Sequence, residues 1–200
     1  MPTRKDIRLK NYDYSQNGAY FVTVCTKNKM CIFWENNDKY KPFTAENGDE
    51  NNQHNVDTTN ESDVLHPNVG TAIGRPQTKQ KIHLSEYGKY VKEALNSVNQ
   101  HYPMVYVDKY VIMPNHIHVI IRIDNSKYID IGGRPMAVPT ISTIINQLKG
   151  YVSKKSGFHV WQGRFHDRIL RNEHEYYGAW QYIESNPTNW ENDELFINEN

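Results

Sequence analysis

The sequence has few cysteines and no long apolar run, and these two absences argue against a disulfide-stabilised protein and against a membrane protein. Only Cys25 and Cys31 occur among 200 residues, too few for a disulfide framework or a cysteine-built zinc site. No apolar run approaches the roughly 18 residues of a membrane span, and the opening MPTRKDIRLK has no apolar signal segment. We therefore expect a cytoplasmic protein with no membrane partner.

The chain also lacks a net charge, but its charges are unevenly distributed. Residues 35–63 carry eight acids and two bases, and residues 191–200 add four acids and no base. The rest of the chain then has 21 bases against 11 acids. A basic body of this kind is typical of a nucleic-acid binder, although solubility alone also produces it.

One segment has almost no aliphatic residues. Residues 46–63, ENGDENNQHNVDTTNESD, are dominated by Asn, Asp and Glu and cannot bury enough apolar surface to become ordered. We expect a mobile surface insertion at about residues 36–80. The remainder suits a single domain over residues 1–190, followed by an acidic tail at 191–200.

Hydrophobic periodicity outside the insertion predicts the order of the secondary structure. Strands are expected at residues 19–26, 105–112, 116–123 and 158–170, and helices at 85–102, 139–157 and 172–187. Ser85 and Asn172 are candidate N-caps, Gly157 ends the second helix, and Gly163 interrupts the last strand. The order predicts an α+β fold, the ferredoxin-like split β-α-β sandwich, with helices on one face of an antiparallel sheet and an additional C-terminal helix.

Two histidines open the third predicted strand, in the run MPNHIHVIIRI. Because side chains alternate along a strand, Ile117, Val119 and Ile121 share an apolar face that suits the core. His116 and His118 are neighbours on the opposite face, near the middle of the sheet. Two adjacent imidazoles suit a divalent metal, but such a pair is also common as ordinary strand structure, so a third ligand is needed.

The last predicted helix offers two pairs of candidate residues. At 100° per residue, Tyr182 and Asn186 stack one turn apart on one flank of its apolar face. Tyr177 and Gln181 form a rival pair on the opposite flank. Either pair combines a hydroxyl nucleophile with an amide oxygen ligand, and either is also compatible with an ordinary helix edge, so geometry alone leaves the choice open.

Three segments carry a family resemblance. YVIMPNHIHVIIRI resembles the histidine–hydrophobic–histidine (HUH) motif of the single-tyrosine transposases. VWQGRFHDRILRNEHEYYGAWQYIESNPTNW resembles their C-terminal segment with its Tyr-Ile-x-x-Asn-Pro element. RKDIRLKNYDYSQNGAYFVTVCT resembles the opening of the branch of REP-associated tyrosine transposases. The match covers about residues 4–29 and 82–190, and leaves the insertion out.

The resemblance implies a metal-dependent endonuclease and strand transferase that acts on single-stranded or hairpin DNA. By position, His116, His118 and Asn186 correspond to the ligands of a Mg²⁺ or Mn²⁺ ion. Tyr182 corresponds to the nucleophile that forms a 5′-phosphotyrosine, and Tyr177 with Gln181 becomes the second choice. The resemblance leaves open whether the chain is a monomer or a homodimer.

Basic residues provide candidate contacts to DNA phosphates. Arg4, Lys5, Arg8 and Lys10 crowd the N-terminal arm, with one acid among them. Lys149, Lys154 and Lys155 of the second-to-last predicted helix are weaker candidates.

The hypothesis of a metal-dependent tyrosine transposase competes with two others. One is a non-catalytic nucleic-acid binder on a ferredoxin-like sheet. The other is a metal hydrolase without a covalent intermediate, which is disfavoured because no carboxylate lies near the histidines in the sequence.

Overall fold

The computed structural model describes residues 13–35, 82–127 and 138–197. The chain divides into two units, one of Met1–Pro42 with Lys81–Asn200 and the other of Phe43–Gln80, which lies outside the described residues. Every described residue belongs to the first unit. The insertion predicted at 36–80 lies outside the described residues, as do Arg4, Lys5, Arg8 and Lys10.

Four antiparallel strands form the sheet, in the order β2-β3-β1-β4. The strands are β1 (Gly18–Cys25), β2 (Val105–Ile112), β3 (His116–Ile123) and β4 (His166–Leu170). The order places β1 and β3 at the centre, as the split β-α-β arrangement requires. The fold class predicted from the sequence is therefore confirmed.

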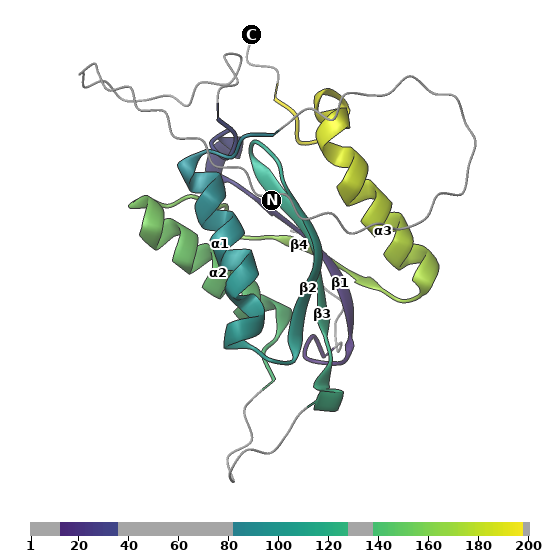
Figure 1. Cartoon of the computed structure of the whole chain (residues 1–200). Helices are drawn as coiled ribbons and strands as arrows, with labels where there is room; N and C mark the ends of the chain where they lie inside the picture. The colour runs from purple at the N-terminus through teal and green to yellow at the C-terminus, as the bar shows by residue number, and fades with distance from the viewer. Residues whose placement is uncertain (1–12, 36–81, 128–137, 198–200) are drawn as a thin grey trace, which may run out of the picture. The chain divides into compact units, whose positions relative to one another are not determined.

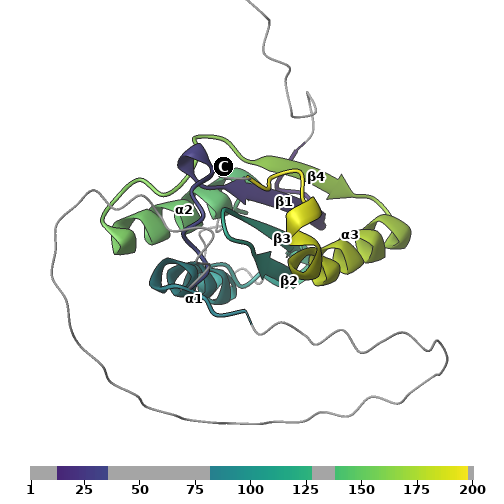
Figure 2. The same cartoon turned by 90° about the horizontal axis from the view of Figure 1, so that it is seen from above.

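Helices α1 (Glu86–His101) and α2 (Ile141–Ser156) cover one face of the sheet, as Figures 1 and 2 show. The Ser85 hydroxyl caps α1 by accepting from the Gly88 N–H, and Gly157 ends α2 in the left-handed conformation with φ of 76°. Both predicted caps are confirmed. The larger core lies under these helices. It includes the residues on the face of β3 that was predicted to be buried: Ile117, Val119, Ile121 and Ile123.

Gly88 marks the closest approach in this layer. A Cβ at that position would lie 2.3 Å from the Phe33 carbonyl oxygen, a distance that real Cβ atoms do not tolerate. Only glycine therefore lets α1 lie directly against the segment that follows β1.

Helix α3 (Glu173–Ser185) lies on the other face of the sheet (Figure 1). The Asn172 side chain accepts from the Glu175 N–H and confirms the predicted cap. The chain then continues through a 3₁₀ helix, Asn186–Asn192, with Pro187 in its first turn. Ile183 and Trp190 from this C-terminal region join Ile120 in a second, smaller apolar cluster. Among the described helices, none is long and apolar enough to cross a membrane.

The last predicted strand is shorter than expected. Residues 158–170 were predicted to form it, but β4 begins only at His166, and Trp161 makes an isolated bridge to Thr26. In the backbone before β4, three carbonyl oxygens accept hydrogen bonds from the Lys149 ammonium instead of from a neighbouring strand. They belong to Gln162, Gly163 and Arg164, at 2.6, 3.4 and 3.3 Å.

Candidate metal and tyrosine site

The two histidines lie at the beginning of β3, on the face that α3 covers. In the register with β1, His116 is opposite Cys25 and His118 is opposite Thr23. His116 is fully buried and His118 is 4% exposed. They are therefore not the solvated strand residues that the sequence alone left possible.

Neighbouring polar groups orient both rings. The Asn115 amide nitrogen donates to the Leu195 carbonyl at 2.9 Å, so its amide oxygen faces His116 and accepts from the Nδ1–H at 2.8 Å. Nδ1 of His118 lies 2.8 Å from the Thr23 hydroxyl, which can donate or accept. Nε2 of His116 is then left with a free lone pair, which is the form that binds a metal.

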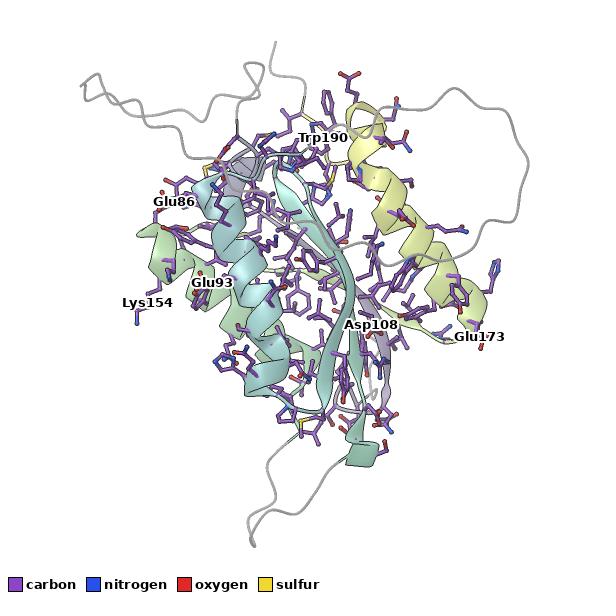
Figure 3. The ribbon with its side chains drawn as sticks, viewed as in Figure 1. Glu86, Glu93, Asp108, Lys154, Glu173 and Trp190 are labelled. Carbon is purple, nitrogen blue, oxygen red and sulfur yellow. The ribbon has the colours of Figure 1, made fainter. Side chains whose placement is uncertain are left out.

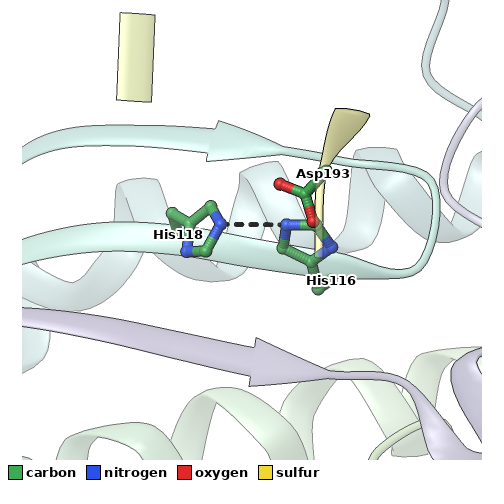
Figure 4. A group of neighbouring side chains, drawn as sticks. All are labelled: His116, His118 and Asp193. Carbon is green, nitrogen blue, oxygen red and sulfur yellow. Dashed lines mark hydrogen bonds between the residues drawn. The ribbon is translucent and has the colours of Figure 1, made fainter. Parts of the chain in front are cut away.

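The Nε2 atoms of the two rings face each other at 3.0 Å (Figure 4). Burial and, to a smaller extent, the adjacent His118 lower the pKa of His116 to about 3, against the opposing effect of Asp193. Burial also lowers the pKa of His118 to about 4, again opposed by Asp193. Both imidazoles are therefore neutral at pH 7, with their Nε2 atoms directed at one another.

A carboxylate completes this cluster, and it corrects the prediction from sequence that none lies near the histidines. Figure 4 shows Asp193 beside His116 and His118, with one ligand atom from each residue within 4.8 Å of the others. Sequence reasoning had placed Asp193 in the acidic tail. Helical spacing gave no signal for this contact, because the chain reaches Asp193 through a 3₁₀ helix that has a non-helical residue at Asn189.

Asn186 lies in the same cluster. Its amide nitrogen donates to Oδ2 of Asp193 at 3.1 Å, and its side chain is buried, with 4% of the residue exposed. Its amide oxygen is buried and has no hydrogen-bond partner among the described residues. An unpaired buried amide oxygen is costly unless a ligand satisfies it, and a divalent cation would do so. The donor set of two imidazoles, an amide oxygen and a carboxylate fits Mn²⁺ or Mg²⁺.

Tyr182 borders the cluster from α3. Its hydroxyl donates to Oδ2 of Asp193 at 3.5 Å, and its ring meets the His118 ring edge-on with centroids 5.1 Å apart. The residue is 45% exposed, so its oxygen can be reached from solvent. Burial raises the pKa of Tyr182, as does Asp193, while a hydrogen bond from Asn186 lowers it. The phenol is therefore protonated at neutral pH.

The rival pair on α3 lies elsewhere. Tyr177 is 61% exposed, and its ring packs against Tyr176 with a centroid separation of 5.8 Å. Gln181 is exposed as well. The structure thus brings Tyr182 and Asn186 to the histidines and leaves Tyr177 and Gln181 on the solvent side of the helix.

The basic residues of α2 lie across the sheet from the histidines. The ammonium of Lys149 is mostly buried and donates to three backbone carbonyls, a contact that stabilises the fold, whereas its predicted phosphate contact stays a prediction. Lys155 pairs with Glu93 at 3.6 Å, and Lys154 is exposed on the outer helical layer (Figure 3). Neither adjoins the histidine cluster.

Comparisons with known proteins give a relative that matches over most of the chain. No model of a known protein family matches the chain. A protein of Haemophilus influenzae (strain Rd), described as uncharacterized, is 30% identical over 209 residues, which cover 97% of this chain and 93% of that protein. The chain belongs to the same family as this Haemophilus protein.

Two solved structures share part of the backbone arrangement. One is a REP-associated tyrosine transposase bound to a REP hairpin, with 17% identity and a TM-score of 0.48, covering 92% of this chain and 74% of that one. The other is a candidate transposase from Deinococcus radiodurans R1, with 13% identity and a TM-score of 0.39, covering 89% and 95%.

Proposed function

We propose that this protein is a metal-dependent endonuclease and strand transferase for single-stranded DNA, including hairpin or repeat DNA, with Tyr182 as its nucleophile. The observation that carries the proposal is the convergence of a half-exposed tyrosine, an unpaired buried amide oxygen and two oriented imidazoles. The resemblance of the surrounding segments to single-tyrosine transposases leads to the same assignment. Tyr182 is the nucleophile, and His116, His118 and Asn186 are the metal ligands.

The chain's own residues would hold the metal and the proton. His116 and His118 would bind through Nε2, and Asn186 through its unpaired oxygen, while the amide nitrogen of Asn186 stays on Asp193. A bound Mg²⁺ or Mn²⁺ ion supplies a Lewis acid that polarises a non-bridging phosphate oxygen. Asp193 accepts the phenol proton along the existing hydrogen bond from Tyr182.

The proposed reaction conserves the energy of the phosphodiester. The Tyr182 oxygen bonds to phosphorus, the bond from phosphorus to the 3′-oxygen breaks, and that oxygen leaves as a 3′-hydroxyl after it takes up a proton. The product is a 5′-phosphotyrosine. A second 3′-hydroxyl can then attack it and join a new strand without ATP.

A denaturing gel tests the assignment directly. A labelled single strand that contains a hairpin is incubated with the protein and Mn²⁺, and a band that retains both protein and label marks the covalent product. We expect Tyr182→Phe to abolish this band, while the matched variant Tyr177→Phe retains it. Adduct from Tyr182→Phe together with none from Tyr177→Phe would refute the choice of nucleophile.

Asp193 also supports a second candidate, a metal-dependent hydrolase without a covalent intermediate. Two imidazoles and a carboxylate are a common metal-binding set for activating water. The same gel separates the two functions, because a hydrolase gives cleaved strand without adduct and is indifferent to Tyr182→Phe. A non-catalytic binder of the RNA-recognition type is disfavoured, since it needs an open sheet face for stacking, and α3 covers this face.

A further inference from the structure

An open pocket of about 440 Å³ lies beside Tyr182, between β4 and α3. Its lining comes from three elements: Phe21 and Thr23 of β1, His166, Asp167 and Arg168 of β4, and Gly178, Ala179 and Tyr182 of α3. The volume falls within the range of about 300–1,000 Å³ that is typical of small-ligand sites. A single nucleotide is a ligand of this size class.

The strand register makes this pocket continuous with the histidine cluster. Thr23 pairs with His118 on one side and with His166 on the other, so these three side chains form one row across the sheet. Phe21 stacks on the His118 ring with centroids 5.2 Å apart and meets the Tyr182 ring edge-on at 5.9 Å. A ligand in the pocket therefore lies next to the proposed nucleophile and one strand away from a proposed metal ligand.

On the α3 side of the pocket, the wall has no side chain at Gly178. Gly178 precedes Tyr182 by four residues, so the two positions are neighbours on one helix flank. A Cβ at Gly178 would meet no described atom within 4 Å. Glycine weakens a helix interior relative to alanine, and packing within the described protein does not require it here. An exposed stretch of helix backbone beside Tyr182 allows a flat group to approach closely.

The opposite wall, on β4, offers donors for a phosphate. β4 is an edge strand, and both His166 and Arg168 are exposed. No hydrogen bond or ion pair joins the side chain of either residue to another described residue. Because the guanidinium is a planar fork of donors, Arg168 can bind two phosphate oxygens at once.

We propose that this pocket holds one unpaired deoxynucleotide of the DNA strand, adjacent to the phosphate that Tyr182 attacks. Arg168 and His166 donate to its phosphate, and its base lies between the Phe21 ring and the bare backbone at Gly178. The inference rests on the proposed function. It adds that the enzyme holds the strand by an arginine on the edge of the sheet and by stacking, beside the metal cluster.

Equilibrium binding tests the pocket separately from catalysis. The full chain carrying Tyr182→Phe is titrated into a fluorescein-labelled single strand of random sequence, and fluorescence anisotropy is followed at several salt concentrations. We expect Arg168→Gln to weaken binding about tenfold and to lower the salt slope by about 0.7, the value for one lost contact to a single strand. Gly178→Leu, which fills the pocket, is expected to weaken binding by a similar factor without changing the slope.

Two matched variants control for charge and for helix substitution. Lys92→Gln removes an exposed charge from α1, and Gly150→Leu replaces a glycine of α2 that also has open space at its Cβ; both helices cover the other face of the sheet. Both controls should bind as the parent does. Thermal unfolding checks that each variant is folded, and Gly178→Ala replaces Gly178→Leu if the larger side chain unfolds the protein.

The outcomes distinguish the pocket from the proposed function. Pocket variants that bind like the parent, or that lose no more affinity than their controls, overturn the pocket even when the wild-type chain forms the tyrosine adduct. A parent that does not bind the strand overturns the proposed function and the pocket with it. Selective weakening in Arg168→Gln and Gly178→Leu supports the pocket.

Discussion

Replacing Asn115 with alanine should weaken metal binding without removing any proposed ligand. Asn115 is 1% exposed and orients the His116 ring through the 2.8 Å contact to Nδ1, while its nitrogen holds the Leu195 carbonyl. In Asn115→Ala the His116 ring loses the group that fixes its tautomer and direction. Losing a partner of this kind costs about 10–100-fold in metal affinity, or about 1.4–2.7 kcal/mol.

Isothermal titration of Mn²⁺ into the metal-free protein measures this loss. A second readout is the stabilisation by Mn²⁺ in thermal unfolding, since each tenfold loss of affinity removes about 1.4 kcal/mol when the metal is in excess. The structural control is Asn99→Ala, because the Asn99 amide also donates to carbonyls, those of Pro103 and Val105, but at the far end of α1. Asn99→Ala should leave Mn²⁺ affinity unchanged.

Asn115→Asp separates the two roles of the amide. An aspartate keeps an acceptor for Nδ1–H of His116 but loses the donor to Leu195. If ring orientation determines affinity, Asn115→Asp binds Mn²⁺ at least as tightly as the wild type, whereas Asn115→Ala does not. Wild-type affinity in Asn115→Ala would refute this role for Asn115, and equal losses in both variants would transfer it to the Leu195 contact.

Three further predictions follow from the packing and the charge distribution. Gly88→Ala should destabilise the fold by about 1–3 kcal/mol in urea unfolding, because its Cβ would lie 2.3 Å from a carbonyl oxygen. The control Gly150→Ala has open space at its Cβ and should not destabilise the fold, and a Gly88→Ala variant as stable as the wild type would contradict the close approach. Lys149→Met should cost about 1–3 kcal/mol of stability by leaving buried carbonyls unpaired, yet leave the salt slope of DNA binding unchanged; a lowered slope would restore Lys149 as a phosphate contact. Removal of residues 1–10 should lower that slope by about 3 for its four bases, and an unchanged slope would show that the arm does not contact DNA.

Local sequence signals were enough to predict the elements and their order. Ser85, Asn172 and Gly157 are caps whose chemistry is local, and the structure confirms all three. The alternation along β3 also assigned its core face correctly, because one face of a central strand must be buried. Once the element order indicated the split β-α-β arrangement, the central position of the histidines followed.

Long-range polar contacts could not be predicted in the same way. Lys149 was predicted to contact DNA, but it lies between Ile145 and Val152 on the buried face of α2. Its partners are carbonyls of a loop that no periodicity places. Asp193 reaches the histidines only because the chain continues as a 3₁₀ helix after α3 and buries Trp190 against the second cluster.

The docking of α3 explains why a helix can place Tyr182 beside a cluster built on the sheet. The register of β2 shifts between Val107 and Lys109, so a bulge at Asp108 interrupts the alternation of side chains. As a result two consecutive residues reach α3: Asp108 accepts from the Tyr176 hydroxyl at 3.0 Å, and the Lys109 ammonium lies 4.7 Å from the centre of the Trp180 ring. In a regular strand one of these two side chains would point into the core, where a charge is costly. The bulge therefore adds polar contacts at Tyr176 and Trp180 to the apolar cluster that Ala179 and Ile183 join, and both kinds of contact hold α3, which carries Tyr182, against the sheet.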